Sequence, residues 1–121
     1  MNEKGVKPSI LIVLTTVANR TEAETLAEKL VRSRLAACVQ VLPAMTSVYY
    51  WEDKVQKETE HLLLIKSLWK NWDELRDFIT RNHSYKVPEI VAIDAAKVSS
   101  AYLIWLVDEM ARQPEASGTK L

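Results

Sequence analysis

Residues 47–66 read SVYYWEDKVQKETEHLLLIK, and this stretch decides the fold. The β-branched and aromatic residues of 47–51 are typical of a strand, and the polar residues 52–54 predict a turn. A second strand then returns with alternating faces, Thr59, His61, Leu63 and Ile65 on one and Glu60, Leu62, Leu64 and Lys66 on the other. The stretch therefore predicts a long β-hairpin.

The residues before the hairpin predict a strand, a helix and a further strand. Ile10–Leu14 is an unbroken apolar run, short enough for a buried strand. Thr21 and Glu24 have the spacing of a capping box, and apolar residues at helical spacing follow them. Residues 36–42 predict the next strand, which is interrupted at Pro43 because proline has no backbone N–H to donate.

The residues after the hairpin add a helix, a strand and a helix. Residues 71–74 repeat the capping spacing and open a helix that ends near His83, and residues 90–93 predict the next strand. Ser99 or Ser100 caps a last helix. With residues 36–42 and 47–51 taken as one strand interrupted at Pro43, the order is β-α-β-β-α-β followed by a helix. This order predicts an α+β protein of the ferredoxin-like class with an antiparallel sheet.

Composition limits the function. The 121 residues fit a single domain, with an ordered core over about 9–112 and polar tails at 1–8 and 113–121. Sixteen basic and sixteen acidic residues leave no net charge, which argues against nucleic-acid binding. We see neither a signal peptide nor an apolar run long enough for a bilayer, so no membrane partner is expected. A single cysteine, Cys38, favours a reducing compartment, and we expect a cytoplasmic protein.

Glycine is confined to Gly5 and Gly118. Walker loops and dinucleotide fingerprints need glycine where the backbone approaches phosphate, so both motifs are excluded from the chain between these positions. The absence of glycine from the folded segment, together with short loops, predicts high thermal stability.

Several strands are apolar on both faces, and Tyr49, Tyr50 and Trp51 add exposed aromatic surface. We expect these three residues to pack against further copies of the chain. The alternative is that they stack on RNA bases, but the strands lack the basic aromatic signature of such modules. Lys57, Glu58, Glu60 and the charges of the first helix predict a solvated surface.

His83 and Glu89, in the segment HSYKVPE, are the first candidates for a polar site. Together they could bind a divalent cation such as Cu²⁺ or Zn²⁺, but two ligands are too few for a closed site. Alternatively, His83 caps the end of a helix and Glu89 pairs with a lysine such as Lys66.

Cys38 is either a soft metal ligand, a nucleophile or a small core residue, and the core is favoured because no second cysteine is present. An enzyme that used Cys38 with His83 would need the two side chains to meet in space. The spacing shows no set of nucleophile and base, so we predict that the protein is not an enzyme.

Four segments, residues 35–39, 47–52, 64–66 and 83–90, together resemble the CutA divalent-cation-tolerance proteins over about residues 9–111. The resemblance implies a ferredoxin-like homotrimer in the cytoplasm that binds copper and serves metal tolerance. It also implies a likeness to PII signalling trimers. The alternative function is therefore a signalling or ligand-sensing trimer that takes a small anion or metabolite at subunit clefts.

The same resemblance carries His83 and Glu89 over as the metal ligands, with Tyr85, Lys66 and Cys38 shaping the pocket. The chain departs from the family at several positions: a cysteine used by copper-binding members is replaced by Thr15, one of the paired histidines of some members by Asn82, and the turn glycine by Asp53.

Overall fold

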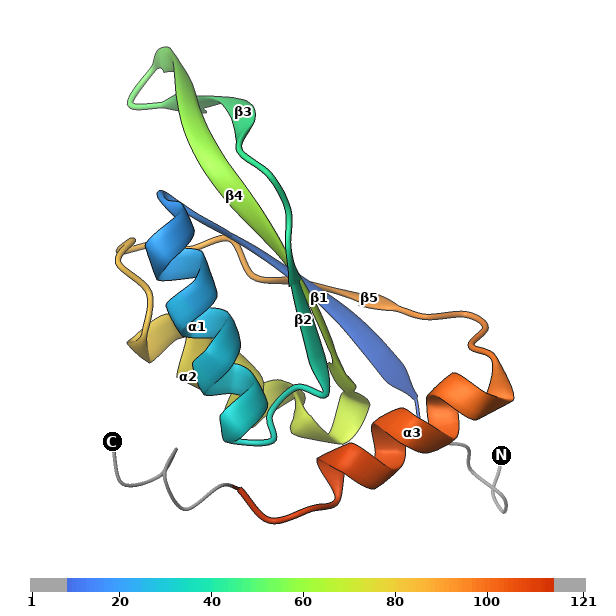
Figure 1. The fold of residues 1–121 in the computed structure, drawn as a ribbon. Helices are drawn as coiled ribbons and strands as arrows, with labels where there is room; N and C mark the ends of the chain where they lie inside the picture. Colours follow the sequence, from blue (N-terminus) through green and yellow to red (C-terminus); the bar gives the residue numbers. More distant parts are fainter. Residues whose placement is uncertain (1–8, 115–121) are drawn as a thin grey trace.

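The computed structural model describes residues 9–114 and forms an α+β fold (Figure 1). Its elements follow the chain in this order: β1 Ile10–Val17, α1 Arg20–Arg32, β2 Cys38–Val41, β3 Met45–Trp51, β4 Lys54–Leu68, the 3₁₀ turn Trp69–Asn71, α2 Trp72–Arg81, β5 Val91–Asp94 and α3 Ser100–Met110. The predicted order of elements is confirmed. Of the tails predicted at 1–8 and 113–121, residues 1–8 and 115–121 lie outside the described part of the chain.

The strands form one antiparallel sheet in the order β2-β4-β1-β5, and β3 pairs with the other half of β4. This order is the ferredoxin-like arrangement, with β1 and β4 side by side at the centre of the sheet. The predicted fold class is therefore confirmed.

The hairpin forms because a two-residue turn joins β3 to β4. Glu52 and Asp53 both adopt positive φ angles, of 52° and 64°, and Trp51 pairs with Lys54 across the turn. Positive φ angles at both central residues are typical of the two-residue hairpin turns whose twist matches that of the flanking strands. We call β3 together with residues 54–60 of β4 the hairpin arm, and Figure 1 shows it projecting beyond the helices.

Two apolar clusters hold the layers together. The larger one packs α1 and α2 on one face of the sheet, through residues that include Val13, Leu26, Leu63 and Ile79. The smaller one packs α3 against the opposite face, through Ile10, Leu68, Leu106 and Met110. Because α3 covers only one end of that second face, apolar residues of β5 such as Val91 and Ile93 stay exposed.

Two local predictions are corrected. Asn19, not Thr21, caps α1: its side-chain oxygen accepts from the backbone N–H of Glu22 at 2.8 Å. The strand predicted at 36–42 is shorter, because residues 33–37 turn out of α1 before β2 begins at Cys38. Within residues 9–114, the helices are all too short or too polar to cross a membrane.

Candidate ligand-binding site

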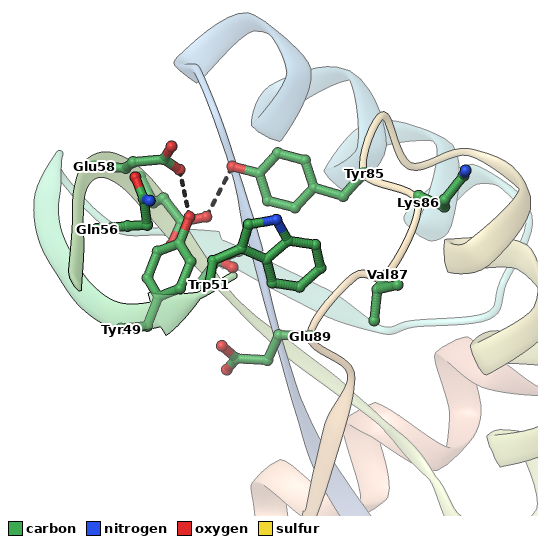
Figure 2. Close-up of a pocket in the computed structure, with 10 residues that line it drawn as sticks. Tyr49, Trp51, Gln56, Glu58, Tyr85, Lys86, Val87 and Glu89 are labelled. Carbon is green, nitrogen blue, oxygen red and sulfur yellow. Dashed lines mark hydrogen bonds between the residues drawn. The ribbon is translucent and has the colours of Figure 1, made fainter. Parts of the chain in front are cut away.

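A pocket of about 500 Å³ lies between the hairpin arm and the segment 83–90, which connects α2 to β5 and which we call the 83–90 loop (Figure 2). Its walls are formed by Thr16, Tyr49, Trp51, Gln56, Glu58, Glu60, Tyr85, Lys86, Val87 and Glu89. Three carboxylates against one lysine give this pocket a negative charge.

Because successive side chains of a strand point to opposite faces, only one face of the arm lines the pocket. Tyr49 lies opposite Gln56, and Glu58 lies one pair further along on the same face. The Tyr49 hydroxyl donates to Glu58 Oε1 at 2.7 Å, and this hydrogen bond to the carboxylate raises the pKa of Tyr49.

Glu60 lies where the arm joins the central sheet, and its side chain is only 6% exposed. The Tyr85 hydroxyl donates to Glu60 Oε2 at 2.8 Å. Burial, followed by this hydrogen bond, raises the pKa of Tyr85. The prediction that Glu60 belongs to a solvated surface is therefore wrong. Its side chain shares a sheet face with Leu62 and Leu64, and this alternation in the sequence was the available signal.

His83 holds the 83–90 loop in place rather than pointing a free nitrogen into the pocket. Its Nε2 bonds the carbonyl oxygen of Thr16 at 2.8 Å, and its Nδ1 bonds the backbone N–H of Tyr85 at 3.0 Å. Because a carbonyl only accepts and an N–H only donates, we assign a neutral ring with its hydrogen on Nε2. Both ring nitrogens are therefore engaged, and they position Tyr85.

The loop is tied down further by α1. The backbone N–H and the hydroxyl of Ser84 donate to the carboxylate of Glu22, in the first turn of α1, at 3.1 and 3.0 Å. The alternative prediction that His83 caps α2 is wrong, because α2 ends at Arg81 and Asn82 is its C-cap. The Asn82 side chain donates to the carbonyl of Phe78.

Of the predicted pocket residues, Tyr85 and Glu89 line the pocket, whereas Lys66 and Cys38 lie elsewhere. Cys38 and Lys66 face each other across β2 and β4, six residues along β4 from Glu60, or roughly 20 Å. Lys66 donates to the side-chain oxygen of Gln40 at 2.6 Å. The structure does not bring Cys38 and His83 together within one chain.

The predicted interface residues divide between two faces of the arm. Tyr49 and Trp51 line the pocket. Tyr50 points to the opposite face, where it is 76% exposed and shares an apolar surface with Val48 and Val55. We call these three residues the outer face of the arm.

The donors of the pocket do not converge on one point. Within residues 9–114, no three side chains of His, Cys, Asp or Glu are close enough to hold a metal ion together.

Thr15 lies in the helix-side core with its hydroxyl unpaired among the described residues, and its neighbour Thr16 lines the pocket instead. Sequence reasoning missed Thr16, Gln56 and Glu58 as pocket residues.

Known proteins resemble the chain over most of its length. It is 42% identical over 95 residues to the divalent-cation tolerance protein CutA of Thermus thermophilus, covering 78% of this chain and 92% of that protein. It is 40% identical over 106 residues to the chloroplastic protein CutA of Arabidopsis thaliana, covering 88% of this chain. The chain spans 58% of the length of that plant protein.

Solved structures agree with this similarity. The divalent cation tolerance protein of T. thermophilus superposes with a TM-score of 0.78 at 41% identity, covering 80% of this chain and 94% of that one. The periplasmic divalent cation tolerance protein CutA of Archaeoglobus fulgidus superposes with a TM-score of 0.81 at 30% identity, covering 84% of this chain and 98% of that one.

These names overturn the expected location. The Arabidopsis relative is named as chloroplastic and the Archaeoglobus protein as periplasmic. The prediction of a cytoplasmic protein, drawn from the single cysteine and the resemblance, is therefore wrong.

The match to a family confirms the resemblance that the four motifs carry. Residues 11–109 match the model of the CutA1 divalent ion tolerance protein. This range includes every strand that builds the sheet except the first residue of β1, and it includes the whole pocket. The chain belongs to the CutA1 divalent ion tolerance family.

Proposed function

We propose that this protein is a homotrimer that binds divalent cations in the pocket and serves metal tolerance without being an enzyme. The observation that carries the proposal is the acidic wall of the pocket, in which the buried Glu60 stands with Glu58 and the exposed Glu89. Carboxylate oxygens are suitable ligands for divalent cations, and the names of the relatives refer to tolerance of such ions.

Glu60 and Glu89 are the ligands that we assign, with water or a neighbouring copy supplying the rest. Oxygen donors favour harder cations such as Mn²⁺ or Mg²⁺, whereas Cu²⁺ favours imidazole. Binding of Cu²⁺ by His83 stays a prediction, and it requires the ring to give up its hydrogen bond to Thr16 or to Tyr85.

The outer face of the arm supports the trimer. Tyr50, Val48 and Val55 are all more than half exposed, on a hairpin that extends beyond the core. A two-stranded hairpin by itself is marginally stable, so an apolar outer face favours contact with another copy. A ring of copies closes such head-to-tail contacts without leaving an edge.

Calorimetric titration with Mn²⁺, Zn²⁺ and Cu²⁺ tests the cation site. We expect binding in the wild type, a loss of at least about tenfold in affinity in Glu60→Gln and Glu89→Gln, and no change in Glu74→Gln, an exposed control on α2. Loss of binding in His83→Ala with unchanged binding in both glutamate variants would instead identify His83 as the ligand. Absence of heat with all three ions would refute the site.

Light scattering tests the assembly. The wild type is expected at three times the chain mass at micromolar concentration, and Tyr50→Asp is expected to shift the protein toward monomer. Thr25→Asp, on an exposed position of α1, is the control that should stay trimeric. A monomeric wild type would contradict the proposal.

A further inference from the structure

The buried carboxylate of Glu60 has no cationic partner within the described residues 9–114. Its hydrogen-bond partner there is the neutral hydroxyl of Tyr85, at 2.8 Å, and the ion pairs of this part of the chain involve other residues. Acidic side chains this deeply buried are almost always paired with a positive charge. The pocket therefore has a place for a cation that comes from outside the chain.

The size of the pocket indicates more than an inorganic ion. A volume of about 500 Å³ falls in the range of pockets that hold small organic molecules, about 300–1,000 Å³. Within residues 9–114, no three side chains of His, Cys, Asp or Glu lie close enough together to hold one metal ion. A ligand with an extended body can contact more of the separated carboxylates at once than a single ion can.

The remaining walls are aromatic. Figure 2 shows the Trp51 indole beside the Tyr49 ring and below the Tyr85 ring, with the Glu89 carboxylate on the other side of Trp51 from the Tyr85 hydroxyl. Aromatic faces attract organic cations, and their apolar area packs against alkyl chains. Glu58, Glu60 and Glu89 outweigh Lys86, so the charge of the pocket opposes the small anion that the alternative function requires.

We propose that the pocket binds an organic ammonium ion, with one nitrogen at Glu60, its alkyl chain along Trp51 and Tyr49, and a second cationic group near Glu89. The inference shares its pocket with the proposed cation site but does not depend on a metal. The ligand class follows from three features that coincide: a buried unpaired carboxylate, aromatic walls and a second carboxylate at the rim.

Linear diamines with three to eight carbons are the probe, and diols of the same lengths are the neutral controls. Both series are titrated by calorimetry into the full-length protein after treatment with EDTA. We expect the diamines to bind with an optimum in chain length and the diols not to bind. Affinity should fall at least about tenfold in Glu60→Gln and severalfold in Trp51→Leu, and it should be unchanged in Glu74→Gln.

Because Glu89 is exposed, Glu89→Gln keeps the test valid if Glu60→Gln fails to fold. This variant should lower the affinity for long diamines more than the affinity for short ones. Equal binding of diols and diamines, or diamine binding unchanged in Glu60→Gln and Glu89→Gln, would overturn the inference. If titration with metal ions gives heat of binding and titration with diamines does not, this inference is overturned and the proposed function stands. If diamines give heat of binding and metal ions do not, this inference is supported and the metal site is overturned.

Discussion

At the scale of single residues, three side chains decide how the pocket is built. His83 fixes the backbone of Tyr85, and the Tyr85 hydroxyl donates to the buried carboxylate of Glu60. The effect of the histidine on the pocket is therefore indirect. A residue that the sequence marks as a ligand can equally act by holding its neighbour in place.

Removal of the Tyr85 hydroxyl should destabilise the protein, because the buried Glu60 loses the hydrogen bond from Tyr85. For Tyr85→Phe we expect a loss of about 1–3 kcal/mol in the free energy of unfolding at neutral pH. The pKa of Tyr85 is raised above 10 in the folded state, so this stabilisation is fully present below pH 10 and declines as the pH rises further. Urea titrations at increasing alkaline pH should show the gap between wild type and variant narrowing, and a gap independent of pH would contradict the assignment.

Thr15 offers a change in the opposite direction. Its side chain is 0% exposed, and its hydroxyl has no partner among the described residues. Valine has nearly the same shape without the polar group, so Thr15→Val should raise the free energy of unfolding by about 1 kcal/mol. Chemical denaturation measures this, with the exposed Thr25→Val as the control, and a destabilised Thr15→Val would indicate a partner outside the described residues.

At the scale of elements, the hairpin arm serves two purposes. Its inner face supplies Tyr49, Trp51 and Glu58 to the pocket, and its outer face carries Tyr50. The alternation of a strand makes this division possible, because neighbouring residues point to opposite sides. Three consecutive aromatic residues therefore do not form one surface.

The turn of the arm requires positive φ angles, which its two central residues tolerate less well than glycine would. Glu52 and Asp53 hold positive φ angles of 52° and 64°, which cost a residue other than glycine about 1–2 kcal/mol. Glu52→Asn combined with Asp53→Gly should raise the free energy of unfolding by about 1 kcal/mol, whereas Asp53→Ala should lower it. Thermal denaturation of the three proteins checks the order, and a more stable Asp53→Ala would contradict the turn geometry.

The elements followed from the sequence because each has a local cause. Apolar runs, helical spacing and a polar turn are visible in residues 10–14, 23–35 and 52–54. The pocket did not follow, because its walls come from β4 and the 83–90 loop, and only the folded chain brings Glu60 to Tyr85. Lys66 was misplaced for the same reason: nothing in a linear sequence tells which end of a long strand faces a loop.

At the scale of the whole molecule, the second face of the sheet is only half covered. The helix α3 packs over Ile10 and Leu68, while Val91 and Ile93 remain about half exposed. Apolar sheet surface of this kind is stabilised when further copies cover it, so assembly and stability are linked.

The melting temperature should therefore be high and should depend on concentration. Short loops without glycine and the proposed trimeric interface predict a value above about 65 °C, the upper end of the ordinary range for mesophilic domains. Dilution should lower it, as mass action requires. Scanning calorimetry over a hundredfold range of concentration checks both points, and a concentration-independent value of 45–65 °C would contradict them.

The division of β4 has one more consequence, for the way the molecule opens. Residues 61–68 of β4 pair with β1 on one side, and part of this segment also pairs with β2 on the other side. Residues 54–60 pair with β3 alone. The arm is therefore a separate unit of local unfolding, able to open while the sheet stays intact. Amide hydrogen exchange should step up between His61 and Glu60, and a ligand in the pocket, by joining the arm to the 83–90 loop, should erase that step.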